Sequence, residues 1–233
     1  MAQLSTVDNA VQSAGIKGVI YGESGVGKTT LCATLPSPIL ISAEGGLLSL
    51  KSENIMRVYG SSALCTNIPV VQIQTYDEID GVYNWLSQSA ESGQFRSVYL
   101  DSLSEIGELI LEDAKRKNRD LRMAYADTMR RVVGTIRKFR DLRGKHVFMA
   151  CKIGDLESGQ KCPSVPGKKL MQHMPYFFDE IFRLGVGKNG DNVFRYIATQ
   201  PSDLYMAKDR SGALLPYEAP HLGACIQKIF GSV

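Results

Sequence analysis

The chain has 233 residues, of which 44% are apolar, and this is enough apolar material for the core of one large domain. Its net charge of +3 neither requires nor excludes a nucleic acid, so the distribution of basic residues matters more than their sum. The five cysteines, an odd number without a CxxC pair, argue against a disulfide framework and a zinc knuckle.

Residues 1–15 are polar and are expected to form a flexible lead-in to a single domain at 16–233. They lack the basic and apolar regions of a signal peptide, and no apolar run in the chain is long enough to cross a bilayer. We therefore expect no membrane partner and a cytoplasmic location.

Short apolar strands and helical periodicities alternate over the next part of the chain. Strands are expected at 17–22, 38–42, 69–74, 97–102 and 145–151, and helices at 28–35, 76–89, 103–114 and 124–142. This alternation predicts an α/β fold, with a mainly parallel sheet flanked by helices.

The last third of the chain has a different pattern. A segment rich in glycine and lysine at 154–170 is expected to be a mobile loop. Two alternating strands around "GKNGDN" then predict an antiparallel hairpin at one edge of the sheet. A short helix is expected near 221–230.

The sequence "GESGVGKT" at 22–29 lies between a strand and a helix, and it matches the GxxxxGK[ST] pattern of a P-loop. Its glycines let backbone N–H groups wrap a phosphate at a helix N-terminus, where the dipole favours anions. Lys28 would reach the β- and γ-phosphates, and the Thr29 hydroxyl would bind Mg²⁺. The predicted nucleotide-binding residues are Gly22, Glu23, Ser24, Gly25, Val26, Gly27, Lys28, Thr29 and Thr30.

Asp101 ends the apolar run "SVYL", at the tip of a strand that is expected to neighbour the P-loop strand. This is the Walker B position, where a carboxylate supports the Mg²⁺ ion. An aspartate after a strand also caps helices, and "DSLSE" would serve as such a cap. The presence of the P-loop favours a metal site formed by Thr29 and Asp101.

Glu44 follows the strand at 38–42, directly after the P-loop helix, and could face the γ-phosphate. A carboxylate there could orient and deprotonate the attacking water. Spacing alone favours this role no more than a helix cap or a solvated loop acid.

Four stretches, "GESGVGKTT", "ILISAEGGL", "VYLDS" and "HVFMAC", together resemble the ATPase core of RecA-type recombinases. The resemblance spans roughly residues 16–218 and is greatest to core-only RecA-like ATPases of bacteriophages, which act in single-strand annealing and recombination. It implies a RecA-like fold, ATP and Mg²⁺ as cofactors, and Glu44 as the catalytic glutamate beside Lys28. It also implies a homo-oligomer, a filament or a ring, that binds single-stranded DNA and works with a single-strand-binding protein.

The resemblance places two DNA-binding loops, one after the 97–102 strand and its helix and one after the 145–151 strand. Both intervals carry cations that suit a phosphate backbone, namely Lys115, Arg116, Lys117, Arg119 and Arg122, and then Lys161, Lys168 and Lys169. The first cluster would equally suit the solvated end of an amphipathic helix. Stacking aromatics are scarce in both intervals, so binding would depend on charge and backbone.

The stretch "YMAKDRSGALLP" at 205–216 resembles the region in which RecA proteins present two lysines to ATP on a neighbouring subunit. Lys208 and Arg210 fall on those positions and would act as catalytic cations in trans. The residues by themselves fit two exposed charges in a turn equally well.

Two features depart from the RecA pattern. Cys151 and Lys152 stand where those proteins carry a polar residue, usually glutamine, that senses the γ-phosphate. The segment before the core is also short. The γ-phosphate relay and the mode of assembly are therefore open at this point.

Two other classes share the P-loop. A nucleotide or small-molecule kinase could use the arginines between 116 and 143 as a phosphate lid. A helicase-loader type ATPase would bind a protein partner instead. No asparagine is followed by lysine, so the guanine-reading NKxD motif is absent and adenine is the preferred base.

Overall fold

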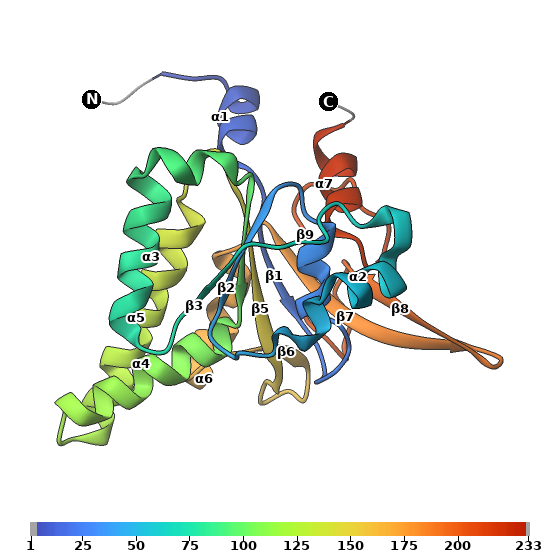
Figure 1. Cartoon of the computed structure of the whole chain (residues 1–233). Coiled ribbons are helices and arrows are strands. Elements are labelled where there is room, and N and C mark those ends of the chain that lie inside the picture. The colour runs from blue at the N-terminus through green and yellow to red at the C-terminus, as the bar shows by residue number, and fades with distance from the viewer. Residues whose placement is uncertain (1–3, 232–233) are drawn as a thin grey trace.

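The computed structural model describes residues 4–231, which form one mixed ten-stranded sheet covered by helices (Figure 1). The strands are β1 (Lys17–Tyr21), β2 (Pro38–Ser42), β3 (Val70–Gln72), β4 (Ser97–Asp101), β5 (His146–Asp155), β6 (Lys161–Ser164), β7 (Glu180–Asn189), β8 (Asn192–Ala198), β9 (Lys208–Asp209) and β10 (Tyr217–Glu218). Their order is β10-β8-β7-β1-β5-β4-β2-β3, with β6 paired to β5 and β9 to β7.

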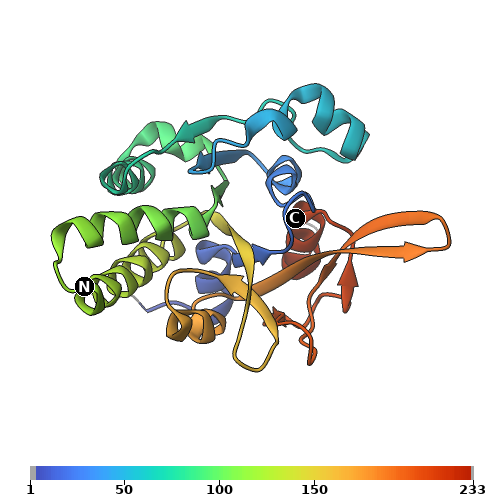
Figure 2. The same ribbon diagram turned by 90° about the horizontal axis from the view of Figure 1, so that it is seen from below.

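The sheet has a parallel part and an antiparallel edge. Strands β7, β1, β5, β4, β2 and β3 run parallel, whereas β8 and β10 complete one edge in antiparallel pairing. The expected α/β class and the expected edge hairpin are confirmed. The β7–β8 hairpin turns at 190–191 and extends well beyond the sheet (Figure 2).

Helices cover both faces of the sheet. The α-helices are α1 (Val7–Ala14), α2 (Ser52–Tyr59), α3 (Tyr76–Gln88), α4 (Leu103–Lys117), α5 (Leu121–Arg140), α6 (Lys168–His173) and α7 (Leu222–Phe230). The 3-10 helices are η1 (Thr29–Thr34), η2 (Leu47–Leu50), η3 (Gly60–Ser62), η4 (Ala90–Gln94) and η5 (Met174–Tyr176). Within residues 4–231, no helix is long and apolar enough to cross a bilayer.

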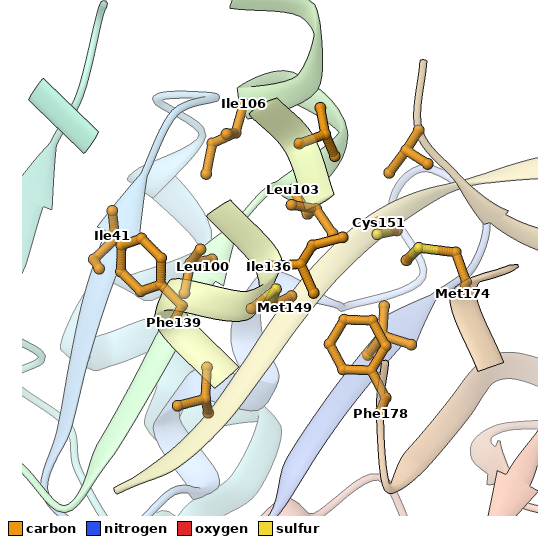
Figure 3. Close-up of a cluster of buried hydrophobic side chains, with 14 of the residues drawn as sticks. Ile41, Leu100, Leu103, Ile106, Ile136, Phe139, Met149, Cys151, Met174 and Phe178 are labelled. Carbon is orange, nitrogen blue, oxygen red and sulfur yellow. The ribbon is translucent and has the colours of Figure 1, made fainter. Parts of the chain in front are cut away.

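The central strands are buried on both faces, as parallel strands covered by helices must be. In β1 the side chains of Val19 and Tyr21 join the cluster under α3, α4 and α5, whereas Ile20 joins the cluster under η1 and α7. Figure 3 shows the first cluster, where Phe139 of α5 lies beside Leu100 of β4. These two cores hold the carboxyl ends of β1, β4 and β2 in place for the site.

Helix α1 was not predicted. Residues 7–14 of the expected lead-in are helical, capped by the Thr6 side chain, and residues 1–3 lie outside the described part of the chain. No residue of α1 is buried, and the N–H of Gly144 donates to the Ser13 carbonyl at 2.8 Å. The segment is thus helical but only lightly attached to the domain.

The expected mobile loop at 154–170 is wrong. Strand β5 continues to Asp155, pairs antiparallel with β6, and helix α6 begins at Lys168. The segment has a defined structure because its residues Cys162 and Val165 are buried in the core. Gly154 allows a close approach, since a Cβ there would meet Met171 Cε at 2.8 Å.

Candidate active site

The P-loop leaves the carboxyl end of β1 and leads into η1, a 3-10 helix where an α-helix was expected. Gly25 and Gly27 take the positive φ values of 74° and 104°, which L side chains rarely adopt. Lys28 Nζ donates to the carbonyls of Gly22 and Glu23 at 2.8 and 2.9 Å, which closes the loop on itself. Burial lowers the pKa of Lys28, and the nearby carboxylates of Asp101 and Glu44 oppose this shift.

Asp101 meets the P-loop directly. Thr29 Oγ1 donates to Asp101 Oδ2 at 2.6 Å, and the aspartate is buried. Burial raises the pKa of Asp101, while the Thr29 hydrogen bond and Lys28 oppose the shift. The alternative of Asp101 as a helix cap is wrong, because Ser102 is the residue that accepts the Glu105 N–H at the start of α4.

The prediction that the strand of Asp101 lies next to the P-loop strand is also wrong. Strand β5 lies between β1 and β4, so Asp101 belongs to the second strand from the P-loop strand. The Thr29 side chain, which follows β1 by eight residues, closes this gap. The adjacency was part of the Walker B interpretation of Asp101, and a sequence motif does not determine the order of strands within a sheet.

Glu44 lies two residues beyond β2, which pairs with β4. The N–H of Ala43 donates to the Asp101 carbonyl at 2.8 Å, and Ser102 Oγ donates to Glu44 Oε1. Helices η2 and α2 have no side-chain cap, so the alternative of Glu44 as a helix cap is wrong. The carboxylate instead faces the P-loop.

One cavity of about 460 Å³ unites these residues. It is lined by Ser24, Gly25, Gly27, Lys28, Thr29, Thr30, Glu44, Ser49, Asn54, Arg57, Val58, Asp101 and Arg195. The sequence predicted the P-loop residues with Glu44 and Asp101, but not the residues from α2 and β8. A helical spacing of Ile55 and Tyr59 could have revealed α2, whereas Arg195 lies in no motif.

The oxygen pair of Thr29 and Asp101 suits a small, hard cation. Mg²⁺ binds through one or two protein oxygens, with phosphates and water completing its shell. Within residues 4–231, no group of three or more His, Cys, Asp or Glu residues could hold a metal by itself. The donor set therefore fits Mg²⁺ that arrives with a nucleotide better than a resident metal.

The predicted DNA-binding cations are only partly free, and none lies in the P-loop cavity. Near the carboxyl end of α4, Lys117 and Arg116 approach Asp113 at 2.8 and 3.8 Å. The turn between α4 and α5 projects from the body of the domain (Figure 1). In the β5–β6 region, Lys161 pairs with Asp155 at 2.7 Å and Lys168 with Glu157 at 3.8 Å. The cations without an ion pair to a described residue are Lys115, Arg119, Arg122 and Lys169.

Lys208 and Arg210 lie away from the P-loop of their own chain. Lys208 Nζ donates to the carbonyls of Pro175 and Phe178, both at 2.8 Å, and burial lowers its pKa. Arg210 pairs with Asp179 at 2.8 Å, in a cavity where β1 begins. A role in trans stays a prediction, and it requires Lys208 to give up two hydrogen bonds.

Cys151 is a core residue. It pairs with Tyr21 across β1 and β5, and burial raises the pKa of its thiol to about 12 (Figure 3). The next residue, Lys152, donates from Nζ to Glu105 Oε2 at 2.8 Å. The usual polar sensor position is therefore occupied by an apolar thiol and a paired lysine.

Ser102 has two roles that one substitution can test. Ser102→Ala removes the α4 cap, at a cost of about 1 kcal/mol in the free energy of unfolding. It also removes a hydrogen bond to the Glu44 carboxylate, worth about 1.5 kcal/mol or tenfold in rate. Urea denaturation and nucleotide turnover measure the two effects. Ser89→Ala, which removes the η4 cap alone, should cost stability but not turnover.

The loop after β1, the Thr29–Asp101 contact and the facing glutamate together define a P-loop nucleoside triphosphatase. The chain belongs to the AAA domain family, whose pattern matches residues 14–211. Among solved structures, it is similar to a KaiC-like protein from the hyperthermophilic archaeon Pyrococcus horikoshii OT3, at 11% identity and a TM-score of 0.41. That match covers 79% of this chain and 78% of the other. No curated protein matches the chain.

Proposed function

We propose that the protein is a Mg²⁺-dependent ATPase that couples ATP hydrolysis to the binding of single-stranded DNA, in phage recombination or strand annealing. The observation that carries the ATPase is the meeting of Lys28, the Thr29–Asp101 pair and Glu44 in one cavity. Three separate strand ends supply these groups, which a simple phosphate-binding loop would not need.

Each residue has a defined task in this proposal. The P-loop N–H groups and Lys28 bind the phosphates, whose charged oxygens are stronger acceptors than the two carbonyls that Lys28 now contacts. Thr29 and Asp101 would hold Mg²⁺, which when bound neutralises phosphate charge. Glu44, oriented by Ser102, would accept a proton from the attacking water.

The resemblance and the charge at the α4–α5 tip support single-stranded DNA as the partner. Arg119 and Arg122 are exposed and form no ion pair with a described residue, so their charge is available to phosphates. Assembly into a filament or ring, with Arg210 acting in trans and a single-strand-binding protein as a further partner, belongs to the same proposal. A kinase lid is less well supported, because Arg131 is held by Asp113 at 2.7 Å and lies 3.9 Å from the Tyr76 ring centre.

The test measures ATP hydrolysis and DNA affinity at several salt concentrations, with and without single-stranded DNA. We expect DNA to stimulate turnover and affinity to fall with salt. The double variant Arg119→Ala/Arg122→Ala should reduce the slope of log affinity against log salt by about 0.7 per cation.

Arg130→Ala is the matched control, since Arg130 is exposed on α5 but already pairs with Asp127 at 2.6 Å. If the wild type hydrolysed ATP at the same rate with and without single-stranded DNA, the coupling would be excluded. The protein would then be an ATPase with another partner. An unchanged salt slope in the double variant would place the DNA elsewhere on the protein.

A further inference from the structure

Arg195 is a cation in the P-loop cavity that no motif assigns. It lies on β8, and it lines the cavity together with Gly27, Thr30 and Val58. A Cβ built on Gly27 would lie 3.6 Å from Arg195 Nε and 3.7 Å from its Cδ. The β7–β8 hairpin therefore brings a guanidinium to the wall of the phosphate-binding loop.

The guanidinium is exposed, and no described residue forms an ion pair that holds it in place. None of the ion pairs formed within residues 4–231 involves Arg195. The cavity has one further arginine that the motifs did not predict, Arg57 of α2, and it donates a hydrogen bond to the Asn54 side chain. An unpaired guanidinium beside a P-loop is suited to bidentate binding of phosphate oxygens.

A second cavity, of about 700 Å³, adjoins the first. The two cavities share Val58 and Arg195. The walls of the second come from α2, the β7–β8 hairpin and the segment before α7, and are mostly apolar: Val58, Tyr59, Val186, Val193, Pro220 and Ala224. Its size and apolar lining suit a small organic ligand with an aromatic ring.

The exposed valines of the hairpin support a ligand in this place. Val186 is 51% and Val193 62% exposed, although β-strands with a free face normally turn polar residues outward. Val186 pairs with Arg195 across the two strands, and Val193 lies two residues before Arg195 on the same face of β8. One face of the hairpin thus presents an apolar wall next to the cation.

The orientation of a nucleotide follows from the two ends of the first cavity. Glu44, Asp101 and Thr29 mark the end of the γ-phosphate and the metal, so the nucleoside must leave on the other side. Arg195 also lines the second cavity, which Glu44, Asp101 and Thr29 do not, and this places it at the other end of the first. Tyr59, in the wall of the second cavity, has its Oη 3.5 Å from Thr30 Oγ1.

We propose that Arg195 binds the nucleotide where the phosphates join the nucleoside, and that the cavity beyond it receives the base. This inference rests on the proposed ATPase function and makes the β7–β8 hairpin part of the nucleotide site. Arg195 is a nucleotide-binding residue in this scheme, and no proton transfer is assigned to it.

The test titrates ADP and inorganic tripolyphosphate, each with Mg²⁺, into wild type and variants by calorimetry. Arg195→Ala should weaken ADP about tenfold to a hundredfold, as expected for a lost charge-assisted contact. Val186→Ala/Val193→Ala should weaken ADP about tenfold but leave tripolyphosphate unchanged, since only ADP carries a base. Lys188→Ala removes an equal charge two residue pairs nearer the turn of the hairpin, and it should change the affinity for neither ligand.

Lys28→Ala separates the inference from the function on which it rests. If ADP binds the wild type, is lost in Lys28→Ala and is unaffected in Arg195→Ala, the inference is overturned and the P-loop site stands. If the wild type binds neither ADP nor tripolyphosphate, the ATPase proposal fails and takes the inference with it. If the double valine variant lost affinity for ADP and for tripolyphosphate equally, the base would bind outside the second cavity. Unchanged melting temperatures establish that each variant is folded.

Discussion

Glu44→Gln is expected to lower the rate of ATP hydrolysis by about 100- to 10,000-fold while ATP binding changes little. Glutamine keeps the shape of the side chain and can still accept the Ser102 hydrogen bond, but it cannot take a proton from water. Because Glu44 lies at the mouth of the cavity and is exposed, the change should leave the free energy of unfolding near its wild-type value.

The rate of hydrolysis at saturating ATP measures the effect on catalysis. Calorimetry with ADP measures the effect on nucleotide binding. Glu53→Gln is the matched control, because Glu53 is an exposed acid of α2 outside the cavity. Full activity in Glu44→Gln would show that another group activates the water and that the acid is an ordinary loop residue. A large loss of affinity would instead assign Glu44 to binding.

Glu180→Gln is expected to stabilise the protein at alkaline pH and to have little effect near pH 5. Glu180 is 1% exposed at the start of β7, and its Oε2 is buried without a hydrogen-bond partner among the described residues. Burial, and next the charge of Asp209, raise the pKa of Glu180 from its ordinary 4.5 to about 8. The folded protein therefore holds this carboxyl protonated at neutral pH.

The direction of the pH dependence follows from proton binding. Between pH 4.5 and 8 the folded chain carries a proton on Glu180 that the unfolded chain has released. The contribution is complete below pH 4.5, and it is lost as pH rises through this window by up to about 1.4 kcal/mol per pH unit. Glutamine does not titrate, so this loss should disappear in the variant.

Urea denaturation at intervals from about pH 5 to pH 9 measures the effect. The free energy of unfolding of Glu180→Gln minus that of the wild type should increase steadily up to pH 8 and then level off. Glu112→Gln, on the exposed face of α4, is the matched control. A constant difference for Glu180→Gln would mean that its carboxyl is ionised throughout this range.

The predictions from sequence were best where the determining residues are close together in the chain. The P-loop depends on the glycines and the lysine of residues 22–29, which set local backbone geometry whatever surrounds them. Asp101 ends one buried strand and Glu44 follows another, and the carboxyl ends of parallel strands gather at one edge of a sheet. The edge hairpin was predicted from its turn residues for the same local reason.

Local sequence signals were insufficient where contacts with distant parts of the chain determine the structure. The polar glycine-rich segment at 154–170 looked like a loop, but the burial of Cys162 and Val165 makes it a strand and a turn. Lys208 looked like an exposed charge, although the carbonyls of Pro175 and Phe178 hold it in place. In both places the partner is supplied by a distant part of the chain.

By itself the sequence determined the kind of chemistry, a P-loop with two acids on an α/β sheet. Only the tertiary structure decided that β5 separates β1 from β4, that Glu180 is buried, and that Arg195 reaches the P-loop. The physical reason is that motifs fix backbone geometry over a few residues, whereas strand order and burial depend on the packing of the whole core. Arg195 is 167 residues from Lys28 in the chain (195 minus 28), and the fold alone makes them neighbours in one cavity.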